Sequence, residues 1–266
     1  PFVTYTSTGS YLFVVDVSRS MQARFACSEP TFLDRARQVM LQTLDAVPEG
    51  RFGIVAFDRF AFPVTQLTSD RAWLADVINN GLFVGLMLEA TQTEIANALT
   101  VVADKRERLP DVFGDVSHII LISDGHVSGA FERRLQAPLG RLREAGVSVS
   151  AVGIGNPEST PITDTDDGQC VSDWIEINGE RVLIPLRADI LKYISTEGAG
   201  GYFTESETAE LAALLRSNLQ PAVTGEAGVD APTRDSSGLF VVIAVLALLG
   251  YVYWPVRFPD EPAVRE

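Results

Sequence analysis

The stretch YLFVVDVSRS, at Tyr11–Ser20, indicates the fold class of this chain. Its first seven residues, Tyr11–Val17, are mostly β-branched or aromatic and lack the polar alternation of a half-exposed strand. Continuous apolar runs of this kind are typical of parallel strands that are buried on both faces. The run SHIILIS, at Ser117–Ser123, predicts a second such strand. We therefore expect a parallel sheet between two layers of helices.

Strand and helix patterns alternate outward from these runs through residues 1 to 220, which predicts an α/β fold. The sheet is expected to be doubly wound and mostly parallel, with helices on both faces. Further strands are expected at Arg51–Phe57, Ala61–Thr65, Val147–Ile154 and Gly201–Thr204, and helices at Phe32–Val47, Arg71–Asn79, Glu94–Arg108, Phe131–Ala145, Arg187–Thr196 and Ser206–Asn218.

One segment interrupts this alternation. Asn178 and Gly179 lie between the apolar runs Trp174–Ile177 and Arg181–Leu186, and Asn-Gly in such a position predicts a β-hairpin. We expect this hairpin to be an insertion after the strand that ends at Ile154.

The composition limits the function classes. The chain has 266 residues, of which 46% are hydrophobic and 21% charged, so it has the composition of a globular protein. Its formal net charge of −14 would repel a phosphate backbone, which argues against nucleic-acid binding. Acidic side chains that converge in the fold would instead suit a divalent cation.

The C-terminal region predicts a membrane anchor. The run Leu239–Trp254 carries no charge, and adjacent apolar residues bring it close to the ~20 residues of a spanning helix. We expect a transmembrane helix at 239–256, after a flexible linker at 221–238 and before a short tail at 257–266. A buried core helix is the alternative. Arg257 and Arg265 in the tail favour a cytoplasmic C-terminus and a periplasmic main domain.

The two cysteines, Cys27 and Cys170, form no CxxC pair, which argues against a zinc site. Both are expected in loops on the carboxyl-end side of the sheet. A disulfide there would fit an oxidising periplasm, and two free thiols are the alternative.

Oxygen-bearing side chains follow the buried strands. The first strand ends in Asp16, Ser18 and Ser20, in the pattern D-x-S-x-S, and Asp124 directly follows the second. Ligands of open α/β sheets bind where the carboxyl ends of strands meet. A threonine from the segment Thr91–Glu94 could complete a set of oxygen ligands for Mg²⁺. Each residue alone is equally consistent with a helix cap or a turn.

Asp16, Ser18, Ser20, a central threonine and Asp124 together resemble the metal-ion-dependent adhesion site of von Willebrand factor type A domains. The resemblance covers roughly residues 8 to 205 of a domain at 1–220. TEIANAL, at Thr93–Leu99, is similar to the family's threonine loop and favours Thr93 as the ligand. The glycines that usually precede this threonine are absent.

A narrower resemblance is to the membrane-anchored bacterial Bat-type group, linked to aerotolerance operons. The segments that carry it are GIGNPESTPI at Gly153–Ile162, IEINGERVLIPL at Ile175–Leu186 and AGGYF at Ala199–Phe203.

The resemblance implies a non-enzymatic binding or scaffolding protein of the bacterial inner membrane, with a single membrane pass. It implies that Mg²⁺, or Mn²⁺ or Ca²⁺, is held by Asp16, Ser18, Ser20, Thr93 and Asp124. One coordination position would stay open for an acidic residue of a protein partner, which we expect to belong to an integral-membrane complex.

Two other functions remain open on the sequence. The chain could be a structural or accessory subunit of a larger inner-membrane complex, with a vestigial or merely stabilising metal site. It could also be a Mg²⁺-dependent phosphohydrolase with Asp16 as nucleophile, although Ser18 stands where such enzymes typically place an acid. The sequence has no G-x-S-x-G, Walker or G-x-G-x-x-G motif.

Overall fold

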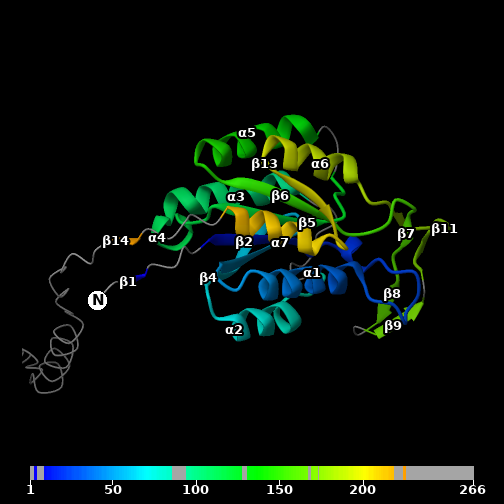
Figure 1. The fold of residues 1–266 in the computed structure, drawn as a ribbon. Coiled ribbons are helices and arrows are strands. Elements are labelled where there is room, and N and C mark those ends of the chain that lie inside the picture. Colours follow the sequence, from blue (N-terminus) through cyan, green and yellow to red (C-terminus); the bar gives the residue numbers. More distant parts are fainter. Residues whose placement is uncertain are drawn as a thin grey trace, which may run out of the picture. The chain divides into compact units, whose positions relative to one another are not determined.

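The computed structural model describes residues 3–4, 9–85, 94–127, 131–166, 169–172, 174–218 and 224–225 (Figure 1). The chain divides into two compact units, Thr6–Val223 and the two terminal segments Pro1–Tyr5 and Thr224–Glu266. In the terminal unit, β1 (Val3–Thr4) pairs antiparallel with β14 (Thr224–Gly225), so part of the expected linker is a short strand.

The larger unit is built on a six-stranded sheet in the order β13-β6-β5-β2-β3-β4. All neighbours are parallel except β3 and β4, which form an antiparallel hairpin at one edge. The mostly parallel sheet predicted from the apolar runs is confirmed. The strands are β2 (Ser10–Asp16), β3 (Arg51–Phe57), β4 (Ala61–Thr68), β5 (His118–Ser123), β6 (Ser148–Gly153) and β13 (Ala199–Thr204).

Helices cover both faces of this sheet, as expected (Figure 1). One apolar core packs α1, α2 and α7 against alternate residues of β2, and the other packs α3, α5 and α6 against the rest. The helices are α1 (Phe32–Ala46), α2 (Arg71–Asp76), which continues as the π-helix η2 (Val77–Gly81), α3 (Ile95–Arg108), α4 (Pro110–Phe113), α5 (Phe131–Glu144), α6 (Ala188–Glu197) and α7 (Thr208–Ser217).

The insertion between β6 and α6 is larger than the single hairpin predicted. The hairpin at Asn178 and Gly179 is present, and both residues have the positive φ angles, 55° and 81°, that a tight two-residue turn requires. Two further antiparallel pairs extend it. The strands are β7 (Thr160–Pro161) with β12 (Leu183–Ile184), β8 (Asp164–Asp166) with β9 (Gln169–Ser172), and β10 (Glu176–Ile177) with β11 (Glu180–Arg181).

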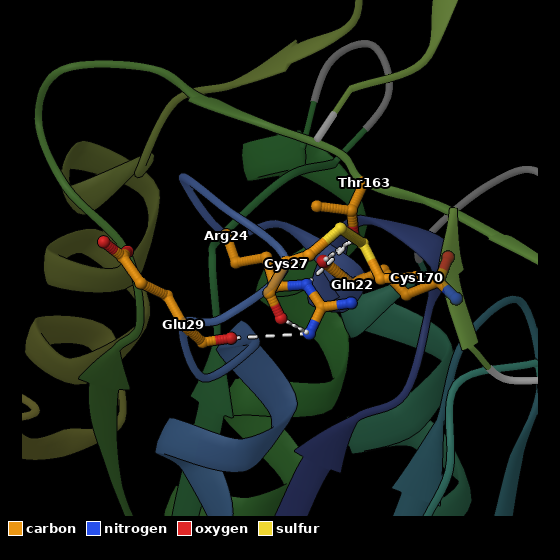
Figure 2. The surroundings of a disulfide bond; sticks show 6 residues. All are labelled: Gln22, Arg24, Cys27, Glu29, Thr163 and Cys170. Carbon is orange, nitrogen blue, oxygen red and sulfur yellow. Dashed lines mark hydrogen bonds between the residues drawn. A yellow bond between two sulfur atoms is a disulfide. The ribbon is translucent and has the colours of Figure 1, made fainter. Parts of the chain in front are cut away.

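A disulfide joins Cys27, in the loop before α1, to Cys170 on β9 (Figure 2). The Cα atoms are 5.6 Å apart, and 143 residues separate the cysteines in sequence. Arg24 reinforces the link because its side chain donates to the Thr163 hydroxyl at 3.2 Å and to the Cys27 carbonyl at 3.2 Å. The insertion is therefore fastened to the loop that follows the D-x-S-x-S segment.

Among the residues that the structure describes, no helix has both the length and the apolar character needed to cross a membrane. The segment 239–256 and the tail at 257–266 lie outside the described residues.

We predict that replacing Cys27→Ser and Cys170→Ser together lowers the free energy of unfolding by about 2–4 kcal/mol, because the bond closes a long loop of the unfolded chain. Urea unfolding of the wild type and the double variant, each with and without reductant, measures this. Reductant should lower the wild-type midpoint and leave the double variant unchanged. Identical midpoints for the wild type and the double variant in the absence of reductant would contradict the prediction.

Candidate metal centre

The candidate site lies at the carboxyl ends of β2 and β5, which are adjacent parallel strands at the centre of the sheet. Asp16 is the last residue of β2, and Asp124 directly follows β5. Both side chains are fully buried. The topology therefore brings together two acids that are 108 positions apart in the sequence.

Asp16 is held in place by hydrogen bonds to both carboxylate oxygens. Oδ1 accepts from the backbone N–H of Ser18 at 2.9 Å, and Oδ2 accepts from the Ser123 hydroxyl at 2.7 Å. One bond comes from the loop after β2 and the other from the end of β5. The carboxylate is consequently fixed between the two strands.

Ser18 and Ser20 continue the same loop into the short 3-10 helix η1 (Arg19–Gln22). Ser18 has extended backbone angles, φ −68° and ψ 168°, and the backbone N–H of Met21 donates to its carbonyl at 3.0 Å. The two serine hydroxyls lie 3.1 Å apart and both side chains are buried. The loop thus turns two hydroxyls to one place beside Asp16.

Within the described residues, one carboxylate oxygen of Asp124 accepts a hydrogen bond and the other does not. Its Oδ1 accepts from the backbone N–H of His126 at 2.8 Å, whereas the buried Oδ2 has no hydrogen-bond partner within the described part of the chain. The next residue, Gly125, has φ +78°, and a Cβ there would lie 2.7 Å from the Arg187 carbonyl. This close approach requires glycine and fixes where the Asp124 carboxylate lies.

The electrostatics of the pair are unfavourable without a cation. Burial and the neighbouring Asp124 carboxylate raise the pKa of Asp16 to about 7. Burial also raises the pKa of Asp124, although the Ser20 side chain and the His126 backbone N–H favour its charged form. Two buried carboxylates repel each other in this way unless a positive charge lies close to both.

These residues fit a hard divalent cation. The side chains of Asp16, Ser18, Ser20 and Asp124 offer a cation only carboxylate and hydroxyl oxygens, which are the ligand type of Mg²⁺ and Ca²⁺. Within the described segments, no three His, Cys, Asp or Glu side chains cluster into a metal site. A cation at this place would therefore depend on two acids together with serine and threonine hydroxyls, and the unpartnered Oδ2 of Asp124 is the observation that most directly suits it.

Of the five residues predicted to bind metal, the structure brings Asp16, Ser18, Ser20 and Asp124 together. Thr93 lies outside the described residues, so its role stays a prediction. The next residue, Glu94, donates its backbone N–H to the Asp58 carbonyl at 2.8 Å. The start of α3 is thereby tied to the end of β3.

Sequence reasoning overlooked two residues at this edge. Ser123 is the last residue of β5, and its hydroxyl donates to Asp16 and accepts from the Gly125 N–H at 2.9 Å. Asp58, which directly follows β3, is fully buried, and its Oδ2 has no hydrogen-bond partner within the described chain. Ser123 ends an apolar strand and Asp58 follows one, and this position in the sequence is the signal by which both could have been predicted to lie at the site.

The comparisons with known proteins agree with this architecture. A family model described as von Willebrand factor type A domain matches residues 11–126. A UPF0353 protein of Mycolicibacterium gilvum is 26% identical over 262 residues, which cover 90% of this chain and 68% of that protein.

Two solved structures share the fold. An aerotolerance-related membrane protein from Bacteroides fragilis has a TM-score of 0.65 at 20% identity, covering 79% of this chain and 99% of that one. BatB from Bacteroides thetaiotaomicron, described as a conserved hypothetical protein, also has a TM-score of 0.65, at 22% identity, covering 79% and 98%.

A more distant neighbour contains a metal ion. The TRAP protein of Plasmodium vivax was solved in a manganese-loaded form, and it has a TM-score of 0.55 at 13% identity, covering 85% of this chain and 81% of that one.

We predict that stability in EDTA falls with rising pH because of Asp16. Its pKa is about 7 in the folded chain against an ordinary value of 3.8, so the folded state binds the proton more tightly. The contribution is complete below the ordinary value and is lost as pH rises through about 7. Asp16→Asn should remove this part of the slope and be the more stable chain at pH 8.

Urea unfolding from pH 4 to pH 8, in EDTA, measures the difference between the two chains. Glu180→Gln, an exposed change on the β10–β11 hairpin, is the control and should follow the wild type. Parallel curves for wild type and Asp16→Asn would contradict the assignment.

Proposed function

We propose that the chain, whose residues 11–126 match the family model of the von Willebrand factor type A domain, binds a protein partner through a divalent cation. The observation that carries the proposal is the buried Oδ2 of Asp124, which lacks a hydrogen-bond partner among the described residues and lies in the same site as the Asp16 carboxylate. We propose binding or scaffolding, not catalysis, as the role of this site.

Asp16, Ser18, Ser20 and Asp124, with Thr93, two positions before α3 in the sequence, would hold the cation. Mg²⁺ is our first choice because all five ligands are oxygens, and Mn²⁺ or Ca²⁺ would use the same donors. When bound, the cation supplies an open coordination position for a carboxylate of the partner. The protein's own part is to keep both acids buried and fixed, Asp16 through the Ser18 N–H and the Ser123 hydroxyl, and Asp124 through the His126 N–H.

We also propose that residues 239–256 anchor the chain in a bacterial inner membrane, with the main domain in the periplasm. The description of the Bacteroides fragilis neighbour as a membrane protein supports this placement. The Cys27–Cys170 disulfide supports it independently, because disulfides persist in an oxidising compartment such as the periplasm. The partner would then belong to an integral-membrane complex.

The metal site is tested by titrating Mg²⁺ or Mn²⁺ into the full chain by calorimetry. We expect one site in the wild type and no measurable binding in Asp16→Ala or Asp124→Ala, since each change removes a charged ligand. Glu180→Gln removes the same charge from an exposed hairpin and should bind like the wild type. Equal binding by wild type and Asp16→Ala would refute the site.

The bridging role is tested by purifying the chain with its partner from membranes. We expect the partner to dissociate in EDTA, to return when Mg²⁺ is restored and to be absent from Asp16→Ala preparations. A complex that survives both EDTA and Asp16→Ala would instead favour an accessory subunit whose metal site is only stabilising.

A further inference from the structure

Two arginines beside the site lack the ion pairs that several other arginines of the described chain form. Arg35 pairs with Glu205, Arg134 with Glu94, and Arg141 with Asp104 and Glu107. Arg19 and Arg59 are exposed instead, and neither guanidinium makes an ion pair or hydrogen bond within the described part of the chain. The guanidinium carbon of Arg59 lies over the Phe60 ring, 5.6 Å from its centre.

The fold places both arginines at the edge of the candidate metal centre. Arg19 lies between Ser18 and Ser20 in η1. Arg59 comes two residues after β3, whose last residue, Phe57, is in register with Asp16 and accepts from the Val17 N–H at 2.8 Å. We call Arg19 and Arg59 the basic rim.

Exposed aromatic side chains lie along the same edge. Phe60, next to Arg59 in the turn between β3 and β4, is 54% exposed, and Phe83 is 52% exposed. The segment containing Phe83 reaches the site because the Gly85 N–H donates to the Val17 carbonyl at 3.2 Å. A surface that binds here therefore meets positive charge and aromatic rings together.

The overall charge makes the basic rim informative. A chain of net charge −14 repels an acidic partner at long range, so attraction must come from groups close to the site. Unpaired cations at the rim of an interface typically recognise complementary charges on the partner. A partner that offered only one carboxylate, bound to the cation, would leave Arg19 and Arg59 without an opposite charge to pair with.

We propose that the partner presents a short acidic segment with several carboxylates and a flanking apolar side chain. One carboxylate would occupy the cation, others would pair with Arg19 and Arg59, and the apolar side chain would pack on Phe60 or Phe83. This inference rests on the proposed function and names the chemistry of the partner.

The test uses the full chain, MgCl₂ and two labelled peptides in fluorescence anisotropy. One peptide contains Glu-Asp-Glu flanked by Phe on both sides, and in the other both Glu are replaced by Gln. We expect Arg19→Gln and Arg59→Gln each to weaken binding of the peptide with three acids by about three- to fivefold. Binding of the peptide that keeps only the Asp should not change. Mg²⁺ affinity, measured separately, should stay at the wild-type value.

Arg143→Gln is the matched control. Arg143 is exposed in the last turn of α5, which leads into the amino end of β6, whereas the candidate site lies at the carboxyl ends of the strands. The inference is overturned if Arg143→Gln weakens binding as much as the rim variants, or if the rim variants have no effect. It is also overturned if the wild type does not prefer the three-acid peptide. If peptide binding persists in EDTA but is weaker in the Arg19 and Arg59 variants, the proposed cation bridge is contradicted and the role of the basic rim is supported.

Discussion

The repulsion between Asp16 and Asp124 is the constraint on which the rest of this site depends. The two carboxylates come from neighbouring parallel strands and are fully buried, and neither forms a salt bridge within the described residues. Burial raises the pKa of both groups. Such an arrangement costs free energy in an isolated domain, and a divalent cation at this place would offset that cost.

The surrounding structure keeps the two acids where they are. The Ser123 hydroxyl bonds both to Asp16 and to the loop after β5, so it couples the two strand ends. The Arg187 N–H donates to the Asp124 carbonyl at 2.8 Å and thereby fixes the start of α6 to the same loop. The disulfide adds a third restraint, because it ties the loop between η1 and α1 to the insertion. A rigid set of ligands is what a binding site gains from these contacts.

Much of this could be predicted from the sequence, for a physical reason. Parallel strands buried on both faces are continuous apolar runs, and the carboxyl ends of neighbouring strands meet at one edge. Asp16 lies at the end of one such run and Asp124 directly follows the other, so their proximity was foreseeable. The insertion was only partly foreseeable, because strands of two residues, such as β7 and β12, leave no periodic pattern. The Cys27–Cys170 distance depends on how that insertion folds, so the bond stayed open until the structure was known. The roles of Thr93 and of 239–256 remain predictions.

The most direct measurement of the central claim is a crystal structure of the chain grown with Mn²⁺, with anomalous scattering used to locate the ion. Our account predicts one strong peak bonded to oxygens of both Asp16 and Asp124, with the Ser18 and Ser20 hydroxyls beside it. No peak at this edge of the sheet, or a peak only at the insertion between β6 and α6, would contradict the account.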